Sequence, residues 1–364
     1  MIKYIFTLIF YNSILGKFLA GPLGETVEEK LRKITIRNAR QLIKGYYMVN
    51  YLNNYYLDDI IEKGAADINQ MKPIIIEKFG NIFNFSKLNE STKYGCSCFN
   101  VRDSYGHNLF GRNFDFPEDT NIILWTSPTR GYRSITFING KYIGFKYNDS
   151  IVHNNLLLAP YIPMDGMNER GLSIGGLYLE NSPTHQNKPG QSHLIGTVMM
   201  RGVLDKCANV QEAIKFFESH NMNDIVPWAN HYIITDAKGD AVVIEYWNNE
   251  MIVVKPNNFA KSMYVTNFYL SHPEYPEKMG EDRYEIIEQN LYQTNYTMNS
   301  SATMDVLRQA RTKAVQMPTL WSNVYDTKSL KLVTAFKMDY KTLYNFDVKK
   351  PLVVTIDKIN STKS

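Results

Sequence analysis

A Gly-Cys junction followed by two short extended segments constrains this chain more than any other feature. Cys96 starts the first segment, and the turn-rich stretch 102–107 links it to a second segment that ends at Arg112, which predicts a β-hairpin. In that hairpin Cys96 lies opposite about Phe114. Arg112 and Asp115 then lie close to it. The pattern therefore predicts a cysteine with an arginine and an aspartate beside it on the neighbouring strand.

This grouping suits a nucleophilic cysteine. A cysteine attacks as the thiolate, and because a free thiol has a pKa of about 8.5 it needs a base or a nearby cation. Arg112 can stabilise the thiolate. If the chain is cut after Gly95, the α-amine of Cys96, with a pKa of about 8, is the nearest base, and Asp115 can hold it by a hydrogen bond. The residues alone leave a second interpretation open, a buried structural cysteine beside an Arg112–Asp115 ion pair.

The sequence carries no other catalytic or metal-binding pattern of comparable weight. None of the histidines has ligand-like spacing to a cysteine or to another histidine, so a Cys-His protease and a zinc site are weakly supported. The chain has no phosphate-binding glycine loop and no nucleotide fingerprint. We therefore expect no metal and no organic cofactor.

Charge and cysteine content narrow the class of protein further. The net charge of +4 is small and spread along the chain, so it does not indicate a nucleic-acid partner. Three cysteines do not make a disulfide framework, and Cys96 and Cys98, two apart on one face of a strand, have poor disulfide geometry. Cys207 follows a helix-like stretch and is expected to be a small buried apolar residue.

The region before the cysteine is interpreted as a leader and a prosegment. Residues 1–20 resemble a signal peptide, with an early lysine and an apolar run. Residues 21–95 are expected to form a helical prosegment removed by autocleavage, and residues 96–364 to form the enzyme domain. Later in the chain no apolar run reaches the ~20 residues that span a bilayer. These features predict a protein of the secretory pathway, lysosomal or secreted.

N-glycosylation sequons fit the secretory route. They occur at Asn84, Asn89, Asn148, Asn295, Asn299 and Asn360. In a chain this rich in asparagine, several would arise by chance.

Helical periodicity dominates the expected prosegment. Apolar residues at roughly helical spacing predict a helix over about 25–47, and a second helical stretch is expected over 57–78, broken near Pro73. Nothing in this region carries chemistry. A permanent N-terminal subdomain is the alternative to a prosegment that is removed.

After Cys96 the sequence alternates between strand-like and helix-like stretches. A strong hairpin signal covers 231–246. Further strands are expected over 122–125, 134–138, 156–159, 171–179, 251–255, 263–266, 321–326, 330–336 and 352–356. Helices are expected over 194–206, 210–219, 282–292 and 304–315. Strand blocks separated by helix pairs predict an α+β fold in which helices cover two stacked antiparallel sheets.

Several motifs in order along residues 96–356 resemble one enzyme family. They are Cys96-Ser97-Cys98, Gly111-Arg112-Asn113-Phe114-Asp115, the stretch 165–172, Gly176-Leu177-Tyr178, the hairpin 231–245, Val265-Thr266-Asn267 and Asp282-Arg283-Tyr284. Together they resemble the choloylglycine hydrolase-type enzymes, which are N-terminal-nucleophile (Ntn) hydrolases of linear amides. That superfamily also holds penicillin V acylases, acid ceramidase and N-acylethanolamine acid amidase.

The resemblance implies a four-layer αββα sandwich and autocatalytic removal of the prosegment between Gly95 and Cys96. It makes Cys96 the nucleophile and its freed amine the base. Arg112 and Asp115 support this nucleophile. Asn267 stabilises the tetrahedral oxyanion, and losing one such donor typically costs about 3–4 kcal/mol.

The resemblance also implies a last catalytic arginine and a substrate-binding residue. Arg283 matches the arginine, with Arg308 or Arg311 as alternatives. Tyr178 stands where bile-salt hydrolases usually carry Asn and penicillin V acylases tend to carry Tyr, so it is expected to bind substrate.

The implied reaction is hydrolysis of a linear, non-peptide amide with an apolar acyl part. Candidate substrates are N-acyl lipids, conjugated bile acids and penicillin V. An acyltransferase on the same scaffold and a non-enzymatic lipid-binding homologue are the alternatives. The expected partner is thus a small-molecule amide, with no nucleic acid and no integral membrane span, while the sequence leaves a homo-oligomer open.

Overall fold

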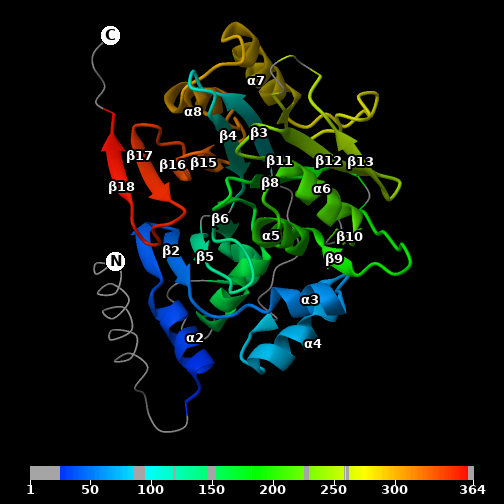
Figure 1. The fold of residues 1–364 in the computed structure, drawn as a ribbon. Helices are drawn as coiled ribbons and strands as arrows, with labels where there is room; N and C mark the ends of the chain where they lie inside the picture. Colours follow the sequence, from blue (N-terminus) through cyan, green and yellow to red (C-terminus); the bar gives the residue numbers. More distant parts are fainter. Residues whose placement is uncertain are drawn as a thin grey trace, which may run out of the picture.

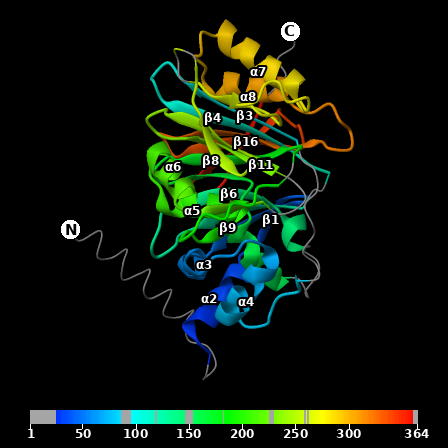
Figure 2. The ribbon, with the colours of Figure 1, turned by 90° about the vertical axis from the view of Figure 1, so that its right-hand side faces the viewer.

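The structure is a computed structural model. Its layers follow one another in the order helices, sheet, sheet, helices (Figure 2). It describes residues 25–85, 95–117, 120–145, 153–181, 183–224, 229–257, 259 and 262–359. The expected signal peptide and the sequons at Asn89, Asn148 and Asn360 lie outside these residues. The layering confirms the predicted α+β sandwich.

The larger sheet has nine strands and runs through the middle of the molecule (Figure 1). In spatial order they are β1 (Arg40–Ile43), β2 (Tyr46–Tyr51), β5 (Asn121–Thr126), β6 (Ser134–Asn139), β7 (Asp165–Asn168), β8 (Ser173–Leu179), β11 (Ala229–Thr235), β12 (Ala241–Trp247) and β13 (Glu250–Val254). The β2–β5 pair is parallel, and the other neighbours are antiparallel. A separate parallel pair joins β9 (His193–Ile195) and β10 (Asn221–Asn223).

The smaller sheet has seven strands, all of them antiparallel to their neighbours. In spatial order they are β14 (Tyr264–Val265), β3 (Gly95–Arg102), β4 (Asn108–Asp115), β15 (Thr319–Asp326), β16 (Lys331–Phe336), β17 (Thr342–Asp347) and β18 (Thr355–Lys358). The β3–β4 register pairs Cys96 with Phe114, as the hairpin pattern predicts.

Three apolar clusters separate the layers. The cluster between the sheets includes Cys96, Cys98, Phe114 and Trp321. Helices α7 (Glu281–Gln293) and α8 (Ser300–Gln309) cover the outer face of the smaller sheet. Helices α5 (Gly196–Lys206) and α6 (Val210–Glu218) cover the outer face of the larger one. Alternation along β3 therefore points Cys96 into the space between the sheets and Phe99 toward the helices.

The segment before Cys96 is built into the larger sheet. Its described residues form three helices, α2 (Val27–Arg37), α3 (Leu57–Lys63) and α4 (Ile68–Phe79). Residues 40–51, expected as a helix end and a polar link, instead form β1 and β2. Tyr46 and Met48 face the space between the sheets, while Tyr47 and Val49 face the outer helices. With both faces buried, β2 lacks the polar alternation that marks a strand in sequence.

Other boundaries differ from the expected ones for local reasons. The predicted break at Pro73 falls instead at Gly64, whose φ is +72°, and Pro73 lies inside α4. Residues 156–159 form part of a 3-10 helix, η3 (His153–Tyr161), because a short apolar run does not distinguish a strand from a buried helix. Strand β17 has no counterpart among the predicted strands. A second 3-10 helix, η2 (Gly140–Ile143), follows β6.

Two further expectations concern the cysteines and the membrane. Cys96, Cys98 and Cys207 are all unpaired and buried, which confirms the apolar interpretation of Cys207. Within the part of the chain that the structure describes, no helix is both long and apolar enough to cross a bilayer.

Candidate active site

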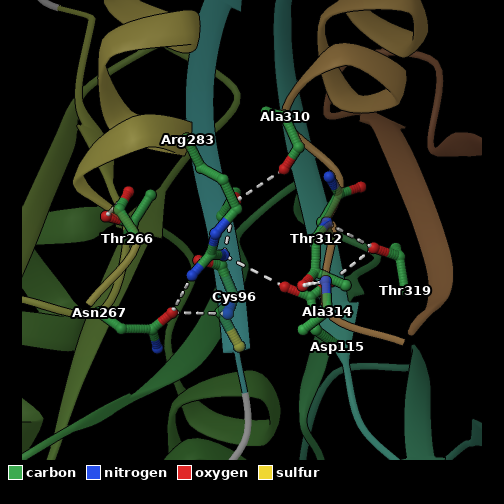
Figure 3. A network of polar contacts seen from close by, with 12 residues as sticks. Cys96, Asp115, Thr266, Asn267, Arg283, Ala310, Thr312, Ala314 and Thr319 are labelled. Atoms are coloured by element: carbon green, nitrogen blue, oxygen red, sulfur yellow. Dashed lines mark hydrogen bonds and ion pairs between the residues drawn. The ribbon is translucent and has the colours of Figure 1, made fainter. Parts of the chain in front are cut away.

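Cys96 lies fully buried on β3, between the two sheets. Its backbone N–H donates to Asn267 Oδ1 at 2.7 Å, and its carbonyl oxygen accepts from Arg283 Nη1 at 2.5 Å (Figure 3). Its Sγ atom lies 3.8 Å from the carbonyl oxygen of Gly176 on β8. The junction that the sequence singles out is therefore enclosed by polar groups from several distant segments.

Asn267 follows β14 and connects the cysteine to its surroundings. Its Oδ1 atom accepts from both Cys96 N and Arg283 Nη2, the latter at 2.9 Å. Its Nδ2 atom donates to the carbonyl oxygen of Tyr178 at 2.9 Å. An amide nitrogen carries two hydrogens, and the bond to Tyr178 uses one of them.

Asp115 ends β4 directly opposite Gly95. One carboxylate oxygen accepts from Thr319 Oγ1 at 2.6 Å, and the other pairs with Arg283 Nη1 at 3.1 Å. Burial raises the pKa of Asp115, although the charge of Arg283 and the Thr319 hydrogen bond act the other way. A Cβ atom placed on Gly95 would lie 2.8 Å from Asp115 Oδ2, so glycine is required where the carboxylate meets the junction.

Arg112 is fully buried and bridges the sheets. It donates to the Cys98 sulfur at 3.3 Å and to the carbonyl oxygen of Gly176 at 2.8 Å. Burial raises the pKa of Cys98 to about 11, with Arg112 acting to lower it. Burial also raises the pKa of Cys96 well above the ordinary thiol value, again opposed by Arg112. In the uncut chain the Cys96 thiol is therefore protonated.

Asp165 is a site component that sequence reasoning did not identify. Its carboxylate faces Arg112 Nε at 3.4 Å. It also accepts three hydrogen bonds from β15, from Trp321 Nε1 at 2.8 Å, Asn323 Nδ2 at 2.9 Å and the Tyr325 hydroxyl at 2.5 Å. A buried carboxylate with this many donors ties Arg112 to both sheets. The sequence feature that could have identified Asp165 was its position at the start of the 165–172 motif.

The structure brings the predicted catalytic residues into one connected region. Cys96, Asp115, Asn267 and Arg283 share a single hydrogen-bonded network, and Arg112 joins it through Gly176. Tyr178 is fully buried and takes part through its backbone carbonyl oxygen.

The alternatives to Arg283 do not reach this network. Arg308 is exposed and pairs with Asp305 of its own helix. Arg311 is also exposed and donates to the carbonyl oxygen of Arg308. Arg283 is therefore the arginine that the fold places beside Cys96.

Two further polar contacts had no signal in the sequence. Thr319 meets Asp115 from β15, and Ser97 accepts from Arg283 Nη1 at 3.0 Å. Single Thr and Ser residues far apart in the chain are recognised only once the strands are placed beside one another.

Comparison with known proteins matches part of this chain to one enzyme family. Residues 96–270 match the family described as linear amide C-N hydrolases, choloylglycine hydrolase family. A penicillin V acylase from Pectobacterium atrosepticum is 22% identical over 191 residues, 47% of this chain and 50% of that protein. The chain thus spans about half the length of this curated relative.

Solved structures support the fold. The conjugated bile acid hydrolase from Clostridium perfringens, as one of its mutants, superimposes with a TM-score of 0.51 at 14% identity. The match covers 73% of this chain and 97% of that one. A second variant of the same enzyme matches with the same TM-score over 74% of this chain. At this identity the likeness establishes the shared fold.

Proposed function

We propose that this protein is a cysteine Ntn amidohydrolase that cuts its own chain between Gly95 and Cys96 and then hydrolyses linear amide bonds. One observation carries the proposal. The peptide nitrogen at this junction lies 2.7 Å from Asn267 Oδ1, with Asp115 packed against Gly95. The uncut chain thus holds the future amine among the groups that would serve it.

Self-cleavage follows from the position of the thiol next to its own peptide bond. The Cys96 sulfur adds to the Gly95 carbonyl carbon, the C–N bond breaks, and the thiol proton passes to the departing nitrogen. The resulting thioester joins Gly95 to the Cys96 sulfur. Water then hydrolyses the thioester, which frees the Gly95 carboxylate and regenerates the thiol beneath a new α-amine.

In the cut enzyme that amine acts as the base for the substrate reaction. It takes the thiol proton while the sulfur attacks the amide carbonyl carbon of the substrate, and Asn267 Nδ2 stabilises the oxyanion. The leaving amine departs with the proton, and water releases the acid from the acyl-enzyme. Arg112 favours the thiolate by its charge, and Arg283, itself paired with Asp115, holds Cys96 through its carbonyl oxygen.

The proposed substrates are acyl conjugates such as N-acyl lipids, conjugated bile acids and penicillin V. The family, the penicillin V acylase relative and the bile acid hydrolase fold support this class. The apolar cluster around Cys96 suits an apolar acyl group.

Purified precursor tests both halves of the proposal. Incubation should yield a new N-terminus at Cys96, detected by mass spectrometry. The cut protein is then given a panel of the three conjugate types at acidic and neutral pH, with and without a competing amine. Release of free acid supports the hydrolase, and acyl transfer to the amine supports an acyltransferase. Binding without turnover by wild type and Cys96→Ala alike would support a non-enzymatic homologue.

A single methyl group at the junction should interfere with self-cleavage. In Gly95→Ala the new Cβ would lie 2.8 Å from Asp115 Oδ2 and 3.1 Å from Asp115 Cβ, and that carboxylate is fixed by Thr319 and Arg283. We expect self-cleavage to slow by roughly 10- to 100-fold, followed as band intensity over time. Gly106→Ala, in the turn between β3 and β4, is the control for backbone strain without a clash, because its φ is +79° and nothing lies within 4 Å of its added Cβ. Equal rates in wild type and Gly95→Ala would contradict this account of the junction.

We further propose a secretory route, to the lysosome or the exterior, with residues 1–20 as the signal peptide and residues 21–95 as the segment severed from the enzyme domain by self-cleavage. The α7–α8 turn supports this, because its sequon residue Asn295 is exposed. Asn299 is also exposed, but its Oδ1 atom accepts from Ala302 N to cap α8. We therefore propose Asn295 as the favoured glycan acceptor of these two.

A buried carboxyl group outside the site predicts greater stability in acid. Asp224 accepts from Thr184 N and Asn230 Nδ2, and burial raises its pKa to about 6. Because the folded chain binds this proton more tightly than the unfolded chain, the free energy of unfolding should fall by about 2–3 kcal/mol between about pH 4 and about pH 6. Asp224→Asn should flatten this part of the profile in chemical denaturation, whereas the exposed Asp339→Asn should not. A wild-type profile that rises over this window would contradict the prediction.

A further inference from the structure

We propose that His231 and Glu245, on the β11–β12 hairpin, are positioning residues that hold Asn267 in place for the reaction. The inference rests on the proposed function, in which Asn267 stabilises the oxyanion. The two ring nitrogens of His231 meet Glu245 and the backbone of Thr266 rather than Cys96. Both residues would therefore act through the segment that carries Asn267.

The backbone alone does little to fix Asn267. Strand β14 is only two residues long and ends at Val265, so the ladder with β3 stops before the asparagine. Beyond it, Asn267 N donates to the carbonyl oxygen of Met279 at 3.2 Å, a single bridge to an irregular segment. An amide that must meet a reacting atom within a few tenths of an ångström needs further support.

His231 supplies that support on the N-terminal side of Asn267. It is fully buried, and its Nε2 atom lies 2.8 Å from the carbonyl oxygen of Thr266. Its Nδ1 atom lies 3.1 Å from Glu245 Oε1. The ring is therefore clamped between the hairpin and the peptide that immediately precedes Asn267.

Glu245 supplies support on the C-terminal side. Its Oε1 atom accepts from Leu270 N at 2.9 Å. Its Oε2 atom accepts from Ser271 N at 2.9 Å and from the Ser271 hydroxyl at 2.5 Å. Asn267 thus lies between two anchors that both originate on one hairpin. The same hairpin abuts β8, where Tyr178 receives the hydrogen bond from Asn267 Nδ2.

The two groups that face the His231 ring are both hydrogen-bond acceptors. Burial would raise the pKa of Glu245, but its hydrogen bonds and the charge of His231 outweigh burial and leave the pKa below its ordinary value. The carboxylate is then ionised and only accepts, and the Thr266 carbonyl oxygen also only accepts. Both ring nitrogens of His231 therefore face hydrogen-bond acceptors. Removing one partner of such a buried pair leaves a charge without compensation.

Two substitutions of His231 test its contacts with Glu245 and with the Thr266 carbonyl oxygen one at a time. An Asn side chain places its amide nitrogen near the Nδ1 position, so His231→Asn keeps a donor for Glu245 and withdraws the one for Thr266. A Gln side chain places its nitrogen near the Nε2 position, so His231→Gln keeps the donor for Thr266. His220→Gln is the matched control, because it withdraws the contact of His220 Nδ1 with a backbone carbonyl oxygen, that of Phe216 on α6, away from the site.

The decisive experiment is a double-mutant cycle with Asn267→Ala on the cut enzyme. His231→Asn should lower kcat by roughly 10- to 100-fold with little change in KM, His231→Gln should lose less, and the control should match wild type. In the Asn267→Ala background, His231→Asn should cost no further activity, because the group that it positions is gone. Losses that multiply would overturn the proposal, since a merely structural role would add its effect in either background.

Hydrogen exchange gives a readout that does not require turnover. Glu245→Gln should speed amide exchange at Leu270 and Ser271, and Ser271→Ala, a milder change that removes one hydroxyl bond, should speed it less. Unchanged exchange in both variants would overturn the anchoring. If wild type neither cuts itself nor hydrolyses any conjugate while exchange responds as expected, the proposed function fails and the anchoring stands.

Discussion

Replacing Cys96 with alanine should leave the chain as one uncut polypeptide and abolish hydrolysis. Without the sulfur neither the thioester to Gly95 nor the acyl-enzyme can form, and removal of a nucleophile typically costs about 10⁴-fold or more. Wild type should instead separate on a denaturing gel into pieces corresponding to residues 1–95, less any leader, and 96–364. The measurement is gel electrophoresis with N-terminal sequencing, followed by turnover of the conjugate panel.

Cys98→Ala is the matched control for this result. Cys98 lies on the same strand and the same face, is equally buried, and contacts Arg112. It should still be cut and should keep most of its activity, because its sulfur has no part in either covalent step. Cleavage of Cys96→Ala at the same bond would refute the assignment of the nucleophile.

A chain that begins at Cys96 should fail to fold, whereas the N-terminal piece of the cut protein should stay bound. The lost segment contributes β1 and β2 to the larger sheet, with β2 paired along its whole length to β5. It also contributes buried side chains to the cores, among them Tyr46, Val49, Tyr51, Tyr55, Ile60, Met71, Ile74, Ile75 and Phe79. At about 1.5–3 kcal/mol for each large apolar side chain, their burial rivals the whole net stability of a domain, about 5–15 kcal/mol.

Hydrogen bonds between the N-terminal piece and the rest of the protein also hold the two pieces together. Tyr46 donates its hydroxyl to the carbonyl oxygen of Leu320 at 2.6 Å, and Tyr55 donates to Asp205 Oδ2 at 2.5 Å. Size-exclusion chromatography of the cut wild type should therefore show both pieces in one peak, separable only by denaturant. A truncated chain that folds cooperatively, or pieces that separate in native buffer, would show that the segment is dispensable.

Local pattern and motif order were enough to predict the sandwich and the principal residues. The Cys96–Phe114 register followed from the turn between two short strands, because a short hairpin loop fixes which residues face each other. The α+β layering followed from the alternation of strand blocks with helix pairs. The order of motifs along the chain predicted Arg112, Asp115, Asn267 and Arg283 as site residues, and the structure places them close to Cys96.

The features that the sequence did not predict depend on contacts between distant segments. Strand β2 was not predicted, and its first two residues were assigned to a helix, because both of its faces are buried and it lacks the alternation of an exposed strand. Asp165 is recognised as a site residue only through its contacts with β15, which lies more than a hundred residues further along the chain. Thr319 is recognised only because β15 places it against Asp115. His231 and Glu245 were predicted to lie on a hairpin. Their hydrogen bonds to the segment that carries Asn267 form only when the hairpin packs against that segment.

The close approach of Gly95 to Asp115 bears on the fate of the new chain end after cleavage. Cutting the bond turns the Gly95 carbonyl into a second carboxylate beside a buried acid, and two like charges about 4 Å apart repel by about 4 kcal/mol at an effective dielectric constant of about 20. The two acids must then share one proton or move apart. Since β2 keeps the rest of the segment docked, the new chain end is the part free to withdraw. Cleavage would thereby favour withdrawal of the new Gly95 carboxylate from Asp115 and from the freed amine of Cys96.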